Sequence, residues 1–152
     1  MSEHNTENLK IDNDLKDQLK TVIHTVENIW EYDSITCFTA KNPFDGINGY
    51  VIIPQDSKLY NTIQYDLPHF NVHGGITFDR KLDGVGRIIG WDTCHLGDNM
   101  NPEFIPVDLR DNIAFQHLFV GRIWDEKIVI EETNILASQL YNYLLEEKEN
   151  IL

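Results

Sequence analysis

The order of the apolar patterns along the chain constrains its fold more than any other feature. In the first part, apolar side chains recur every three or four residues, which is the period of one face of a helix. The stripe consists of Leu15, Leu19, Val22, Ile23, Val26, Ile29 and Trp30. Asp12, Asn13 or Asp14 can cap its start by accepting backbone N–H bonds. We therefore predict a helix over residues 14–32.

Short runs rich in β-branched and aromatic residues follow, and such runs are typical of strands. They are residues 34–40, 49–54, 71–78 and 86–92. Turn-forming residues at 83–85 separate the last two runs, which predicts that these two form an antiparallel pair. Residues 55–70 are expected to form a loop with one helical turn.

A second helical pattern closes the chain, and Asp125 is placed to cap its start. The apolar side of this helix comprises Ile128, Val129, Ile135, Leu136, Leu140, Tyr143 and Leu144, and its water-facing sides are marked by Glu126, Glu131, Glu132, Glu146 and Glu147. The order helix, strands, helix predicts an α+β fold: a small, mostly antiparallel sheet with the N-terminal and C-terminal helices packed against one face. The length of 152 residues fits a single domain over residues 12–152, preceded by a flexible N-terminus at residues 1–11.

The composition disfavours several classes of partner. The chain has 25 acidic and 12 basic residues, and its net charge of −13 opposes direct binding to nucleic acid or to anionic membranes. An acidic surface keeps a protein soluble, and it can also occupy the basic groove of a partner protein. We find no apolar run of the ~18 residues that a membrane span needs and no secretory signal. Because the chain also has only two cysteines, we expect a protein of the reducing cytoplasm.

Residues that could carry chemistry concentrate in two segments. The first is His73-Gly74-Gly75, where glycines inside a predicted strand either let a ligand approach the backbone amides or mark a bulge. If the two strands pair about the turn at 83–85, His73 and Asp92 lie near the same open end of the sheet.

The second segment is Asp92-x-x-His95-x-x-Asp98. With His73, these side chains could hold a divalent metal such as Zn or Mn, or they could supply a general base and the carboxylate that orients it. The alternative is that the aspartates cap turns and His95 makes one backbone hydrogen bond. Cys94 could be a nucleophile with His73 or His117 as its base, or a buried free thiol.

Other side chains near these segments have two interpretations each. The aromatic residues Trp91, Tyr50, Tyr60, Tyr65 and Phe70 could stack on a planar base, or they could pack in the core. Arg80 and Arg87 flank the predicted hairpin turn and could reach a phosphate, or they could be solvated at an exposed turn.

Together, several segments of the chain resemble a group of small uncharacterised proteins that are encoded by bacteriophages and by genomes carrying prophages. They are Gly49–Pro54, Val72–Thr77, Ile89–Asp98 and the helix residues Glu132, Leu136, Gln139 and Leu140, within a likeness that covers roughly residues 46–144. The resemblance implies an accessory protein in the cytoplasm of a bacterial host, of a kind suspected of blocking host defence. Carried over by position, it draws attention to His73, Gly74, Gly75, Asp92, Cys94, His95 and Asp98.

The leading functional hypothesis is a binding module for a small phosphate-bearing, nucleotide-like ligand. The amides of Gly74 and Gly75 would face the phosphate, His73 and His95 would donate hydrogen bonds, and Trp91 would stack on the base. The aspartates would orient the histidines, bind ribose hydroxyls or hold a metal. The ligand-binding set is thus His73, Gly74, Gly75, Trp91, Asp92, Cys94, His95 and Asp98.

Two alternatives stay open, so the sequence does not decide whether the protein is an enzyme. One is a metal-dependent phosphoester hydrolase, in which His73, Asp92, His95 and Asp98 hold the ion. The other is an acidic protein that masks a basic host defence protein. A homo-oligomer is compatible with each hypothesis.

Overall fold

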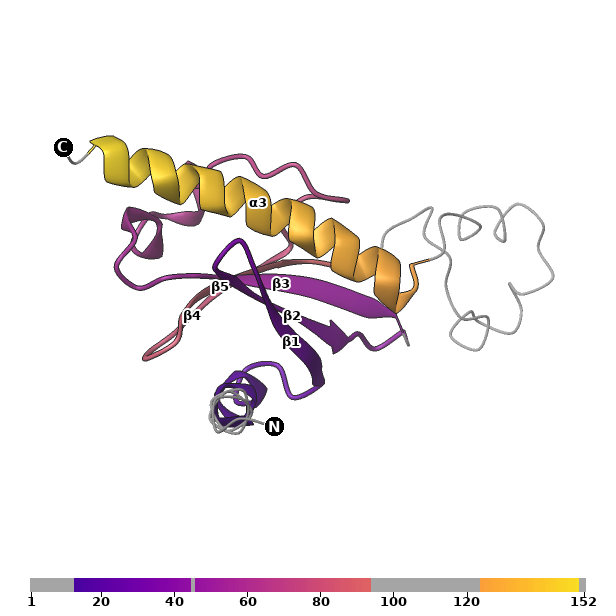
Figure 1. The fold of residues 1–152 in the computed structure, drawn as a ribbon. Helices are drawn as coiled ribbons and strands as arrows, with labels where there is room; N and C mark the ends of the chain where they lie inside the picture. Colours follow the sequence, from indigo (N-terminus) through magenta and orange to yellow (C-terminus); the bar gives the residue numbers. More distant parts are fainter. Residues whose placement is uncertain (1–12, 45, 94–123, 151–152) are drawn as a thin grey trace, which may run out of the picture.

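A five-stranded antiparallel sheet forms the centre of the protein in the computed structural model, which describes residues 13–44, 46–93 and 124–150 (Figure 1). The strands are β1 (Val26–Tyr32), β2 (Ile35–Lys41), β3 (Ile47–Ile53), β4 (Phe78–Leu82) and β5 (Gly86–Trp91), in the spatial order β1-β2-β3-β5-β4. A helix over residues 13–20 precedes the sheet, and α3 (Glu126–Asn150) follows it. These elements confirm the predicted small α+β fold with an N-terminal and a C-terminal helix. No helix among the described residues is long and apolar enough to cross a membrane.

The first predicted helix is only partly correct, because the chain leaves the helix at residue 20 and residues 26–32 form β1. Asp33 and Ser34, with φ of 51° and 65°, make a two-residue turn that pairs Tyr32 with Ile35. Such a turn matches the twist of a hairpin and favours strand pairing over helix continuation. The apolar spacing of Val26, Ile29 and Trp30 fits both structures, so periodicity alone could not separate them.

The two helices lie on opposite faces of the sheet, which corrects the prediction that both pack on one face (Figure 1). Alternate strand side chains divide between two cores, as the two-residue period of a strand requires. The core beneath α3 includes Cys37, Val51, Ile53, Ile89, Trp91, Val129, Leu136 and Leu140, and the core beneath the N-terminal helix includes Leu19, Ile23, Phe38, Ala40, Tyr50, Ile52 and Ile88. Because strands β2, β3 and β5 contribute to both cores, they read as nearly continuous apolar runs.

The β4–β5 hairpin turns at residues 83–85, as predicted, but its first strand begins at Phe78 rather than at residue 71. Residues 71–77 form an irregular segment whose backbone is hydrogen-bonded to Glu132 and Gln139 of α3. The loop before it contains two short 3₁₀ turns, η1 (Lys58–Tyr60) and η2 (Gln64–Asp66), where one helical turn was predicted.

Arg87 is buried at 4% exposure and holds this loop to the hairpin, so neither of its predicted interpretations, phosphate contact or solvation, is correct. Its Nε and Nη2 atoms donate to the two carboxylate oxygens of Asp79, at 2.7 Å and 2.6 Å. Its Nη1 atom donates to the carbonyl oxygens of Leu59 and Thr62. One guanidinium thus joins β5, β4 and residues 59–62, which include part of η1.

Candidate functional site

The glycine pair forms a tight turn rather than part of a strand. Gly75 N–H donates to the Val72 carbonyl at 2.9 Å, and Gly74 and Gly75 have φ of 69° and 76°. A positive φ at the third residue is typical of a type II turn and favours glycine there. The local backbone therefore explains both glycines. Because the Gly75 N–H donates inside the turn, the prediction that it faces a phosphate is wrong. No group in the described residues accepts from the Gly74 N–H.

Two polar side chains of α3 fix this turn in place. Glu132 Oε1 accepts the His73 N–H at 3.0 Å. Two helical turns further along α3, Gln139 accepts the Asn71 N–H at 2.7 Å and donates to the Asn71 carbonyl at 2.8 Å. Residues seven apart lie on one side of a helix, so their spacing places both acceptors along the same irregular segment. Glu132 was expected on a water-facing side of the helix, and Gln139 was named only as part of the resemblance, so neither contact was predicted.

The His73 ring lies against two tryptophans. Its centroid is 4.5 Å from that of Trp124 and 6.2 Å from that of Trp91, and the two indoles are 5.1 Å apart. Trp91 is 1% exposed, and its Nε1–H donates to Thr133 Oγ1 at 3.2 Å. The prediction that Trp91 stacks on a ligand is therefore wrong for this fold, because its ring is already enclosed by the core.

Asp92 and Thr93 continue directly from β5 beside this cluster. Thr93 is buried, and its N–H and hydroxyl bond to Asn48 Oδ1 and the Ile47 carbonyl, while Asn42 Nδ2 donates to its hydroxyl. This network anchors the end of β5 on the start of β3. The structure thus brings His73 beside Trp91, the residue before Asp92, although residues 71–77 do not form the strand that was predicted to place it there.

The remaining predicted site residues, Cys94, His95 and Asp98, lie outside the described residues, as does His117. Within residues 13–44, 46–93 and 124–150, no group of three His, Cys, Asp or Glu side chains could hold a metal ion. The described cysteine, Cys37, is not a candidate nucleophile, because burial raises the pKa of its thiol to about 12.

A groove of about 350 Å³ lies on the Gly75 side of the turn. It is lined by Gln64, Tyr65, Leu67, Pro68, His69, Phe70, Gly75 and Ile76. Of the five aromatic residues predicted to stack or pack, Tyr50, Phe70 and Trp91 are buried, whereas Tyr65 is 94% exposed at the rim of this groove. A side-chain atom at Gly75 would meet nothing within 4 Å, so the groove is open at the turn.

Comparison of the chain with protein-family models, with curated proteins and with solved structures found no match. The resemblance to phage accessory proteins therefore remains a prediction that rests on the segments quoted above.

Proposed function

We propose that this protein is a binding module for a small, phosphate-bearing, nucleotide-like ligand, and that the ligand lies in the groove between residues 64–70 and the glycine turn. The observation that carries the proposal is the groove itself, because it combines an exposed aromatic ring with a backbone turn open to solvent. Its volume of about 350 Å³ falls within the range of known small-ligand pockets, ~300–1,000 Å³.

Each wall of the groove can contact a different part of such a ligand. Tyr65 offers a free ring face on which a base can stack, which takes over the role first expected of Trp91. The His69 imidazole and the Gly74 N–H are donors suited to phosphate oxygens. Aliphatic residues Leu67 and Ile76 line the floor and exclude water from these contacts.

The opposite side of the turn supports this arrangement. Glu132 and the two tryptophans hold His73 in one position, which fixes the turn that forms the groove wall. In this proposal His73 acts by holding the turn, since its ring packs on Trp91 and Trp124 and does not line the groove. An accessory protein of a phage could use such a site to sequester a nucleotide signal of host defence.

No observation on the described residues favours the metal-dependent hydrolase, so binding is the function we put forward. Titration calorimetry with a panel of ribonucleoside monophosphates, diphosphates and cyclic dinucleotides tests it. For a panel member that binds, Tyr65→Ala should weaken binding by about tenfold or more, since stacking on one ring contributes ~1–3 kcal/mol. Tyr65→Phe should keep the affinity because it keeps the ring.

A matched histidine pair provides the control. His69→Ala should weaken the binding of a phosphorylated ligand, whereas His24→Ala should not, because His24 is an exposed histidine that lies outside the groove. The proposal fails if no member of the panel binds, or if Tyr65→Ala binds as tightly as the unaltered protein.

A further inference from the structure

Strand β1 is an edge of the sheet, and part of its outer backbone is unoccupied. It pairs with β2 alone, and its first residues are covered because Lys16 Nζ donates to the Glu27 carbonyl at 3.0 Å. In a two-residue hairpin the residues that flank the turn, here Tyr32 and Ile35, exchange both backbone hydrogen bonds, and such pairs then alternate along the ladder. The N–H and C=O groups of Ile29 and Glu31 therefore point away from β2.

No hydrogen bond within the described part of the chain uses those outward groups. An exposed edge of this kind is where an extended peptide can add to a sheet as a further strand. Three side-chain hydrogen bonds hold the edge in place against α3, which preserves its shape for a partner. They join Asn28 to Glu126, Trp30 to Asn134 and Asp33 to Ser138.

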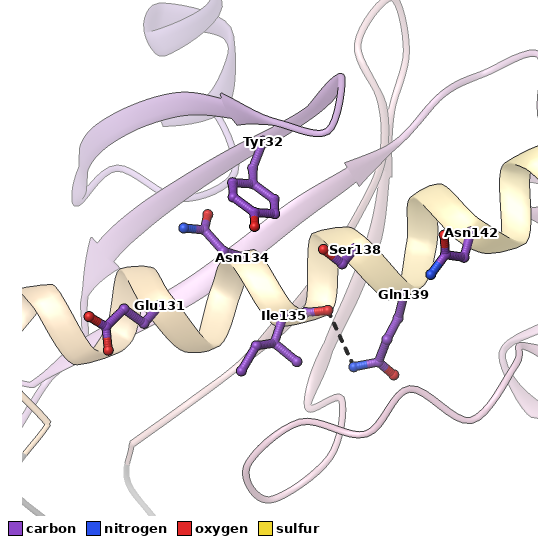
Figure 2. Close-up of a pocket in the computed structure, with 7 residues that line it drawn as sticks. All are labelled: Tyr32, Glu131, Asn134, Ile135, Ser138, Gln139 and Asn142. Carbon is purple, nitrogen blue, oxygen red and sulfur yellow. Dashed lines mark hydrogen bonds between the residues drawn. The ribbon is translucent and has the colours of Figure 1, made fainter.

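A groove of about 420 Å³ adjoins this edge along the outer side of α3 (Figure 2). It is lined by Tyr32, Glu131, Asn134, Ile135, Ser138, Gln139 and Asn142. Tyr32 is 40% exposed and Ile135 is 51% exposed, so the groove offers a partner two apolar side chains among amide and hydroxyl groups. Figure 2 shows the Tyr32 ring extending from the end of β1 towards Asn134 and Ser138 on the helix.

The charge around the edge selects the partner. Glu31, Asp33, Glu126 and Glu131 surround it, and the lysines near it are Lys127, one helical turn before Glu131, and Lys16, at the start of the strand. Glu27 is excluded from this set because it pairs with Lys41 at 3.8 Å. A second copy of this chain would bring a net charge of −13 and another Glu31 to the same edge. A basic segment is attracted to it instead.

We propose that the β1 edge and the adjoining α3 groove bind an extended, basic segment of a partner protein, which adds to the sheet as another strand. Side chains on one face of that segment would enter the groove beside Tyr32 and Ile135, and those on the other face would approach Glu31. Alternating apolar and basic residues fit these two faces. The inference does not depend on the ligand proposed for the other groove.

Fluorescence anisotropy with a labelled peptide of alternating arginine and valine tests the proposal. We expect binding below ~1 mM that weakens with salt, and no binding of the matched glutamate–valine peptide. Glu31→Gln removes only the charge, whereas Glu31→Pro also removes the outward N–H and is tolerated on an edge strand. The proline variant should bind about tenfold more weakly than the glutamine variant, because it cannot form the new backbone hydrogen bond.

Two controls separate strand addition from general attraction of charge. Glu149→Lys, at the far end of α3, should leave the affinity unchanged, and a peptide N-methylated along one edge should bind much more weakly than its parent. Hydrogen exchange at Ile29 and Glu31 should slow when the parent peptide is added. The proposal is overturned if the peptide does not bind, if Glu31→Gln and Glu31→Pro bind alike, or if N-methylation has no effect.

Discussion

The buried pair of Arg87 and Asp79 gives the sharpest stability prediction. The side chains are only 5% and 8% exposed, and two of the four hydrogen bonds of the guanidinium go to the carboxylate. Asp79→Ala would leave a buried positive charge with carbonyl acceptors alone. Breaking such a pair typically costs about 3–5 kcal/mol, and two charge-assisted hydrogen bonds at ~1.5–3 kcal/mol each give a similar value.

This loss is large compared with the total stability of a domain, about 5–15 kcal/mol. Chemical denaturation monitored by tryptophan fluorescence should show it directly, and thermal unfolding should shift by roughly 10 °C for a chain of this size. Asp56→Ala removes an exposed carboxylate in the same part of the fold and serves as the control, with an expected change below ~0.5 kcal/mol.

The double variant Asp79→Leu/Arg87→Met separates burial from pairing. It removes both charges, so it should recover most of the stability that Asp79→Ala loses, although the Leu59 and Thr62 carbonyls lose their donor. The reasoning is refuted if Asp79→Ala costs less than ~1 kcal/mol, or if the double variant is as unstable as the single one.

Three further predictions concern the core beneath α3. Thr39 is fully buried, and its hydroxyl has no hydrogen-bond partner among the described residues. Thr39→Val should therefore leave the free energy of unfolding unchanged or raise it by about 1 kcal/mol in urea titrations. A loss of more than about 1 kcal/mol would show that the hydroxyl has a partner. Gly49→Ala should destabilise by more than ~2 kcal/mol in the same assay, because the added carbon would lie 2.0 Å from Thr133 Oγ1, and a neutral result would mean that α3 can move away. Since burial raises the pKa of Cys37 from 9.0 to about 12, the unfolded chain ionises first, and stability should fall as pH rises between these values by at most ~1.4 kcal/mol per unit. A Cys37→Ala variant with the same slope above pH 9 would contradict this assignment.

Helices and strands were predicted correctly where the spacing of apolar residues fitted only one of the two, and wrongly where the spacing fitted both. Strands β2, β3 and β5 and the helix capped by Asp125, which accepts the Ile128 N–H at 2.9 Å, were found close to their expected bounds. Residues 26–32 were misassigned, because their register depends on a turn at Asp33 and Ser34, which are not glycines and gave no turn signal. The face of the sheet on which each helix packs could not be predicted, because strands that are apolar on both sides can accept a helix on either one.

The candidate site was predicted in part for a related reason. His73 and Asp92 were placed at the same end of the sheet, but the stacking role was given to Trp91, which is buried, rather than to Tyr65, which is exposed. Residue type does not distinguish an aromatic anchor of the core from one at a groove rim. The distinction comes from the loop around η2, which has no periodicity that would place its side chains in advance.

Helix α3 shows most clearly why side-chain chemistry alone was insufficient. Its glutamates were expected to face water, yet Glu132 accepts the His73 N–H, and Glu147 accepts the Lys58 N–H at 2.6 Å and the Ser57 hydroxyl. With Gln139, these acceptors recur along one side of the helix and hold the irregular segments on both sides of the Gly75 groove. The neutral amide introduced by Glu132→Gln or Glu147→Gln could still accept these hydrogen bonds, so the contacts need the side-chain oxygens and not their negative charge.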